Sequence, residues 1–247
     1  MDNPSWPPGN PEACLFDFGG TLDADGVAWQ DRFYALYEKH GVRVDREAFR
    51  QAFYSADDSL TETNTLQGAG LMETLRAQAE GVWNALGLND RTGQLRAIVT
   101  DFFDGMQWHI EHNRSLLVLL KSRYKLGIVS NFYGNLERVC EDLGIHGLFN
   151  CIVDSSRIGA VKPDPRIFQA ALDRLNVRPQ QAVFVGDNPG RDMEGARGLG
   201  MPHVWLAGED VNRRSPCCPG DPVIPTLDAL GPLLLCAESH TPREAGR

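Results

Sequence analysis

The sequence contains no apolar run long enough to cross a membrane, and its first residues, MDNPSWPPGNPE, lack the basic start and apolar stretch of a secretion signal. Basic residues are also few: 24 Lys and Arg stand against 33 Asp and Glu, which gives a formal net charge of −9. Because phosphate backbones attract clustered Lys and Arg, this balance argues against a nucleic-acid partner. These absences predict a cytoplasmic protein that binds neither a membrane nor a nucleic acid.

Only six cysteines are present, and none of their spacings fits a metal site. Cys14, Cys140 and Cys151 stand in apolar segments, where a free thiol behaves as a small hydrophobic group. Cys217 and Cys218 are adjacent in a Pro-rich stretch, but no third or fourth ligand is near them, which disfavours a soft-metal site. A reducing compartment is the simplest location for such a protein.

Apolar patterning divides the chain of 247 residues into a core and one insertion. Residues 13–18, ACLFDF, predict a strand that the following GGT ends. From about residue 27 to 112 the pattern is helical, and after residue 115 short strands alternate with helices, which predicts a parallel sheet with right-handed crossovers. The predicted fold class is therefore α/β, with a Rossmann-like parallel-sheet core and an inserted helical domain. The later strands are expected at 125–130, 151–154, 182–187 and 203–207.

These patterns set the expected domain limits. Residues 1–12 are a Pro-rich lead that we expect to be disordered, and residues 238–247 are a polar tail. Residues 13–23 and 113–237 form the α/β core, and residues 24–112 form the helical insertion.

Polar residues follow the predicted strands at their carboxyl ends. Asp17, Ser130 with Asn131, and Asp187 each lie where a strand ends, and Lys162 lies in the loop after the strand at 151–154. Open parallel sheets bind ligands at this edge. A carboxylate can be a nucleophile, several carboxylates can hold Mg²⁺, and a lysine offsets phosphate charge. The pattern therefore favours phosphoryl transfer.

Four motifs carry a family resemblance: DFGGTL, IVSN, VKPDP and VGDNPGRD. Their order and approximate spacing resemble those of the haloacid dehalogenase (HAD) superfamily over about residues 13–230. The resemblance implies that Asp17 is the nucleophile and a Mg²⁺ ligand, and that Thr21 orients the first loop. It assigns the other metal contacts to the Gly19 carbonyl, Asp187 and Asp192. It assigns binding of the phosphoryl group to Ser130, the Asn131 backbone, Lys162 and Gly20, with Ser130 and Lys162 also acting in catalysis.

The helical insertion resembles a C1-type cap, a domain that closes over the site and supplies substrate contacts. We expect hinges near Asp25–Gly26 and Asn113–Ser115. Only about thirty residues separate Ser130 from Lys162, which leaves no room for the alternative C2 cap.

The first motif departs from the family phosphatases, which read D-x-D-x-T and use the second Asp as general acid and base. Gly19 stands at that position here. Positioned acid–base catalysis is typically worth ~10²–10⁴-fold, so hydrolysis is expected to be weakened unless a cap residue or a water replaces the lost group. Gly19→Asp is expected to restore the carboxylate.

Three functions agree with these residues. The first is a Mg²⁺-dependent phosphohydrolase or phosphotransferase that acts on a small phosphorylated metabolite. The second is cleavage of another bond, as in dehalogenases or phosphonatases, whose first motif also lacks the second Asp. Asp187 argues for a metal and thus against a dehalogenase, and Lys39, the only cap lysine, lies in a context unlike that of a phosphonatase. The third is a catalytically silent binding protein.

Overall fold

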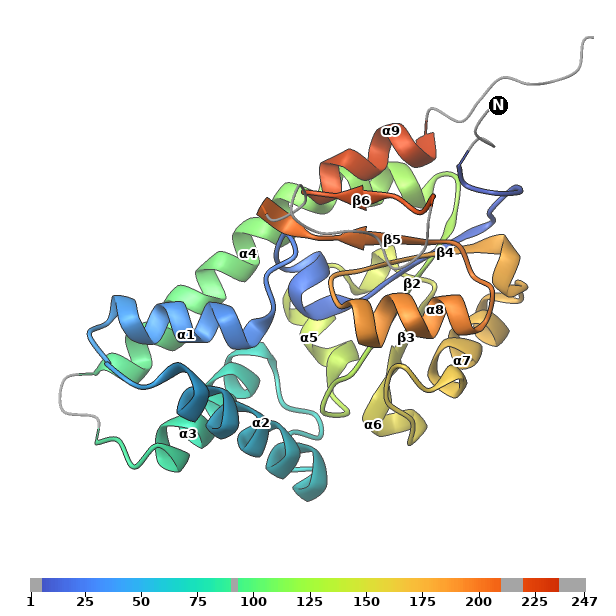
Figure 1. Cartoon of the computed structure of the whole chain (residues 1–247). Coiled ribbons are helices and arrows are strands. Elements are labelled where there is room, and N and C mark those ends of the chain that lie inside the picture. Colours follow the sequence, from blue (N-terminus) through green and yellow to red (C-terminus); the bar gives the residue numbers. More distant parts are fainter. Residues whose placement is uncertain (1–5, 90–92, 210–219, 236–247) are drawn as a thin grey trace, which may run out of the picture.

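A parallel six-stranded sheet organises the core of the part of the chain that the structure describes (Figure 1). The structure is a computed structural model, and it describes residues 6–89, 93–209 and 220–235. The strand order is β3-β2-β1-β4-β5-β6. The strands span Ala13–Phe16 (β1), Lys125–Ser130 (β2), Cys151–Asp154 (β3), Ala182–Gly186 (β4), His203–Leu206 (β5) and Val223–Ile224 (β6).

The centre of the sheet is the point at which the strand order changes direction. β1 pairs with β2 on one side and β4 on the other, so that Phe16 lies beside both Ile128 and Val185. Parallel sheets bind ligands at such a point, beyond the carboxyl ends of the two diverging strands. Asp17, the residue after β1, is therefore at the centre of the predicted binding edge.

Helices cover both faces of the sheet, which explains why its strands are apolar throughout. α7 and α8 pack on one face, and α5, α9 and the end of α4 pack on the other. The core helices span Leu136–Asp142 (α5), Ser155–Ile158 (α6), Pro165–Leu175 (α7), Glu194–Gly198 (α8) and Leu230–Leu235 (α9). Short helical turns span Phe18–Leu22, His146–Leu148, Pro179–Gln181, Pro189–Met193 and Leu227–Ala229.

Four helices follow β1 before the chain returns to the sheet: Trp29–Lys39 (α1), Arg46–Thr63 (α2), Leu71–Ala85 (α3) and Gln94–Lys121 (α4). No strand occurs in the described residues between β1 and β2. Aromatic side chains fill the space between these helices. Phe33 stacks on Phe102 with ring centroids 4.1 Å apart, and Tyr37 meets Phe49 edge to face. Figure 1 shows α1, α2 and α3 as a group beside the sheet, and we call this group with the first half of α4 the cap.

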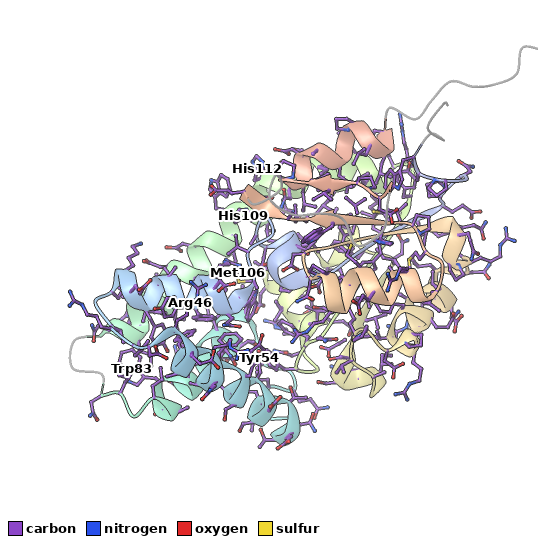
Figure 2. The ribbon with its side chains drawn as sticks, viewed as in Figure 1. Arg46, Tyr54, Trp83, Met106, His109 and His112 are labelled. Carbon is purple, nitrogen blue, oxygen red and sulfur yellow. The ribbon has the colours of Figure 1, made fainter. Side chains whose placement is uncertain are left out.

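α4 joins the cap to the core as one continuous helix. Met106, His109 and His112 follow one another along it from the cap towards the sheet (Figure 2). α4 therefore shows no break at the hinge expected near Asn113–Ser115. No Gly or Pro interrupts residues 107–121, and the apolar side chains of Leu117 and Leu120 continue into the core.

Residues 6–12 correct the expected disordered lead. Trp6 packs against the hydrophobic core, the Glu12 N–H donates to the Gln181 carbonyl (2.7 Å), and the Lys125 N–H donates to the Glu12 carbonyl (2.9 Å). These hydrogen bonds fix the segment, because Glu12 continues β1 between β2 and β4. Residues 1–5, Cys217, Cys218 and the predicted tail at 238–247 lie outside the described residues. Among the described helices, none combines the length and the hydropathy that a membrane span requires.

Candidate active site

The polar residues at the strand ends line one cavity of about 120 Å³ between the sheet and the cap. The core supplies Asp17, Ser130, Asn131, Lys162 and Asp187 to its wall. The cap supplies its opposite wall, with Trp29 and Gln30 of α1 and Phe53, Tyr54 and Asp57 of α2. The fold thus brings together residues that are far apart in the sequence.

Lys162 joins two carboxylates at the bottom of the cavity. Its Nζ lies 2.6 Å from Asp17 Oδ1 and 2.7 Å from Asp192 Oδ1, and the lysine is 3% exposed. Burial alone would lower the pKa of Lys162, but the charges of Asp17 and Asp192 outweigh that effect and raise it. Lys162 is therefore a fixed positive charge beside Asp17.

Asn131 positions this lysine through its side chain. Asn131 Oδ1 accepts a hydrogen bond from the Lys162 N–H (2.7 Å), and Asn131 Nδ2 donates to the Lys162 carbonyl (3.3 Å). The sequence suggested only a contact between the Asn131 backbone and a phosphoryl group. The structure adds a positioning contact that ties the end of β2 to the loop that carries Lys162.

Three carboxylates form a cluster that suits a divalent cation. One oxygen from each of Asp17, Asp187 and Asp192 lies within 4.8 Å of the other two. Burial, followed by the charge of Asp17, raises the pKa of Asp187 well above its usual range, and burial also raises that of Asp192. When all three carboxyls are ionised, Lys162 offsets only one of their negative charges. An all-oxygen donor set with surplus negative charge fits Mg²⁺.

The loop after β1 holds these carboxylates through close backbone packing. Gly20 has φ +88°, and a Cβ there would lie 2.6 Å from Asp187 Oδ2. The Gly20 N–H donates to Asp23 Oδ1 (2.7 Å), and the Gly20 carbonyl accepts from the Gly26 N–H (2.9 Å). Both polar groups of Gly20 thus have hydrogen-bond partners within the loop, and the expectation that Gly20 binds substrate stays a prediction. Thr21 Oγ1 donates to Asp187 Oδ1 (3.2 Å) and so connects the loop to the cluster.

A tryptophan occupies the space beside Gly19. A Cβ on Gly19 would lie 3.1 Å from Trp29 Nε1 and 3.2 Å from Trp29 Cδ1. The indole is held in place because Nε1 donates to Asp23 Oδ2 (2.7 Å), an oxygen that also accepts from Arg32 Nη1 (2.6 Å). A side chain at position 19 would require Trp29 to move by a few tenths of an ångström. The expectation that Gly19→Asp restores the family carboxylate therefore stays a prediction, and it requires Trp29 to shift.

We expect Gly19→Ala to lower the free energy of unfolding by about 1–3 kcal/mol, because the new methyl group overpacks against a fixed indole. The backbone of Gly19 (φ −74°, ψ 120°) suits any residue, so Trp29 alone is the obstacle. Gly147→Ala is the matched control, since a Cβ there meets no atom within 4 Å. Urea unfolding of both variants checks this. Equal stability of the two would contradict the packing argument.

Asp57 is a site residue that the sequence motifs did not indicate. It lies on α2, and its Oδ1 accepts a hydrogen bond from the hydroxyl of Tyr133, in the loop after β2. Burial raises the pKa of the Asp57 carboxyl to about 6, although the bond from Tyr133 and the charge of Arg191 oppose the rise. Only the packing of cap on core brings Asp57 to the cavity, so no local pattern could have revealed it.

Comparison with known proteins identifies the family. A family model described as haloacid dehalogenase-like hydrolase matches residues 11–200. The chain belongs to this family. It is 30% identical over 219 residues to haloacid dehalogenase-like hydrolase domain-containing protein 3 from Bos taurus, which covers 83% of this chain and 86% of that protein. The resemblance inferred from the four motifs is thereby confirmed.

Two further similarities concern one part of the sequence and the fold of this HAD-like hydrolase. Over 94 residues it is 40% identical to glyceraldehyde 3-phosphate phosphatase from Methanopyrus kandleri, which covers 37% of this chain and 40% of that protein. Its fold is similar to that of the HAD-hydrolase YfnB from Bacillus subtilis bound to magnesium, with a TM-score of 0.57 and 17% identity over 92% of this chain and all of that one. The predicted α/β fold class is confirmed.

The lysine considered for phosphonatase chemistry lies away from the cavity. Lys39 Nζ pairs with Asp101 Oδ2 (2.7 Å), and its side chain is 64% exposed. Imine chemistry needs a desolvated lysine at the reacting centre. Nothing in this geometry favours a phosphonatase.

Proposed function

We propose that this hydrolase is a Mg²⁺-dependent phosphohydrolase or phosphotransferase of the cytoplasm that acts on a small phosphorylated metabolite through an aspartyl-phosphate on Asp17. The observation that carries the proposal is the buried Lys162 ammonium, which contacts both Asp17 and Asp192 at the edge of a three-carboxylate cluster. The phosphatase name of the Methanopyrus kandleri relative supports it. Free thiols at Cys14, Cys140 and Cys151 agree with a reducing compartment.

The polar residues of the cavity have separate roles in phosphoryl transfer. An Asp17 oxygen attacks phosphorus, the bond to the leaving oxygen breaks, and an acyl phosphate forms on Asp17. The Ser130 hydroxyl and the Asn131 N–H hold oxygens of the transferred group, and Lys162 offsets its charge. Asp17, the Gly19 carbonyl and Asp187 would hold Mg²⁺, with Asp192 contributing directly or through water. Bound Mg²⁺ supplies positive charge to the phosphoryl oxygens.

We expect Asp187→Asn to weaken Mg²⁺ binding by more than the ~10–100-fold that loss of an outer-shell partner typically costs, because a carboxylate ligand is removed. Isothermal titration calorimetry with MgCl₂ measures this. Asp164→Asn is the control, since Asp164 is the N-cap of α7 and takes no part in the cluster. Equal Mg²⁺ affinity of wild type and Asp187→Asn would contradict the metal assignment.

A screen of phosphorylated metabolites and 2-haloacids, with and without Mg²⁺, tests the proposed function. We expect release of inorganic phosphate only when Mg²⁺ is present. Turnover of a haloacid without Mg²⁺ would replace the proposal with a dehalogenase. Binding of inorganic phosphate without turnover of any compound would instead indicate a catalytically silent binding protein.

A further inference from the structure

One carboxyl group in the cavity has no part in the steps above. Asp57 lines the cavity from α2 of the cap, whereas Asp17 lines it from the end of β1. We propose that Asp57 is the proton-transfer residue of this hydrolase and replaces the carboxylate that position 19 lacks. The proposal rests on the proposed phosphohydrolase function and adds a catalytic residue to it.

The position of Asp57 fits this role. Tyr54, which precedes it by one turn of α2, lines the same cavity and lies on the part of the cap next to the core (Figure 2). A leaving group that departs opposite Asp17 moves away from the sheet and towards the cap. A carboxyl on the cap wall is therefore on the side where the leaving oxygen needs a proton.

The core holds Asp57 in place through Tyr133. Tyr133 follows Ser130 by three residues, and its hydroxyl donates to Asp57 Oδ1. Gln78 of α3 lies against the same pair, with its Oε1 3.5 Å from the Tyr133 hydroxyl. Burial and the nearby Asp57 raise the pKa of Tyr133 well above its usual value, so that it stays a donor. The carboxyl is thus oriented by a group that belongs to the active-site loop.

The charges around Asp57 allow both of its protonation states near neutral pH. Arg191 and the Tyr133 hydrogen bond stabilise the carboxylate, whereas burial and the neighbouring Asp58 destabilise it. Their balance gives the pKa of about 6, and a general acid–base group is most effective when its pKa is near the working pH.

The other acids and bases near Gly19 do not fit the role. Asp23 is fully buried and is already bonded to the Gly20 N–H, Trp29 and Arg32. Asp23 also does not line the cavity, and Trp29 has no titratable group. Asp17, Lys162 and Asp187 are assigned to attack and charge binding. Asp57 is the remaining carboxyl among the described residues that line the cavity.

The proposed cycle balances protons and bonds. In the first step Asp17 attacks phosphorus, the ester P–O bond breaks, and the proton of neutral Asp57 passes to the leaving alkoxide, which departs as an alcohol. In the second step the Asp57 carboxylate takes a proton from water. The resulting hydroxide attacks phosphorus, the bond to Asp17 breaks, and inorganic phosphate leaves while Asp57 is neutral again.

Kinetics of full-length Asp57→Asn with glycerol 3-phosphate and 4-nitrophenyl phosphate test the proposal, with Glu62→Gln, an exposed residue of the same helix, as the control. We expect kcat/KM for the alkyl ester to fall ~10²–10⁴-fold, because its alkoxide must be protonated. We expect kcat/KM for the aryl ester to stay within about tenfold of wild type, because nitrophenolate leaves without a proton. For the aryl ester, kcat of Asp57→Asn should fall and a burst of nitrophenolate should appear, because hydrolysis of the phosphate on Asp17 then lacks its base. Glu62→Gln should behave as wild type.

The pH profile gives a readout that a structural role would not change. The acid must be protonated, so wild-type kcat/KM for the alkyl ester should fall above about pH 6, and this limb should vanish in Asp57→Asn. Tyr133→Phe removes a hydrogen bond that lowers the pKa of Asp57, so the same limb should move to higher pH. If Asp57→Asn does not fold, the shift of this limb in Tyr133→Phe tests the proposal in its place.

Two results would overturn the proposal while leaving the proposed function intact. One is alkyl-ester kcat/KM in Asp57→Asn equal to that of Glu62→Gln. The other is an equal loss of kcat/KM for both esters, which would indicate a structural or binding role. A wild-type protein that hydrolyses neither ester nor any other phosphorylated compound would overturn the proposed function itself and this inference with it.

Discussion

Asp17→Asn is expected to reduce hydrolysis of phosphate esters by about 10⁴-fold or more, the scale on which enzymes lose activity when a nucleophile is removed. An amide cannot form the acyl phosphate, although it can still accept hydrogen bonds from the Phe18 N–H and Lys162 that Asp17 Oδ1 accepts now. The fold should therefore survive the substitution. Steady-state phosphate release measures the loss, and intact-protein mass spectrometry measures covalent phosphate on the wild type and on the variant.

Asp173→Asn is the control for this experiment, because Asp173 is an exposed residue of α7 whose side chain accepts from Gln169. It should keep wild-type turnover. Residual activity of Asp17→Asn within about 100-fold of wild type would exclude Asp17 as the nucleophile, since an obligatory covalent step cannot be bypassed at that rate.

Lys162→Met is expected to lower the free energy of unfolding in the absence of Mg²⁺ by ~3–5 kcal/mol, the range observed when one partner of a buried ion pair is removed. The fully buried Asp192 would lose its cationic partner, and the three neighbouring carboxylates would repel one another without an offsetting charge. Urea unfolding monitored by circular dichroism measures the change.

The matched substitution Lys39→Met should cost less than about 1 kcal/mol, because exposed ion pairs contribute little. A similarly small effect of Lys162→Met would mean that the pair with Asp192 is not important for stability. Added Mg²⁺ should recover part of the loss in Lys162→Met, because the cation would supply positive charge at the same cluster.

The sheet could be predicted because each strand carries its own signal. The apolar runs at 125–130 and 151–154 coincide with β2 and β3, and the residues after the strands of the four motifs meet at one edge. Parallel pairing alone determines which ends of the strands meet. The meeting of Asp17 and Asp187 follows from that rule with no knowledge of the cap, whereas Asp192 is expected beside them only from the resemblance of VGDNPGRD to the family motif.

The cap wall of the cavity could not be predicted in the same way. Periodicity shows that α1 and α2 are helices, but it does not show which residues of α2 face the sheet. That depends on contacts between distant segments, such as Asn135 Nδ2, which donates to Thr74 Oγ1 (2.7 Å), and Asp142, which accepts from the Leu71 N–H (2.8 Å). Asp57 and Trp29 both owe their place in the site to such docking.

The unbroken α4 has a consequence for the timing of the reaction. A helix of 28 residues is about 42 Å long, so one of the two connections between cap and core is stiff, and the other is the short segment from Leu22 to Trp29. We expect the cap to admit substrate by tilting as one body about α4. Such a tilt withdraws Asp57 from Tyr133 and from the nucleophile in the same movement. With the cap open, no base would lie beside Asp17. A phosphorylated Asp17 would therefore be hydrolysed only after the cap had closed again.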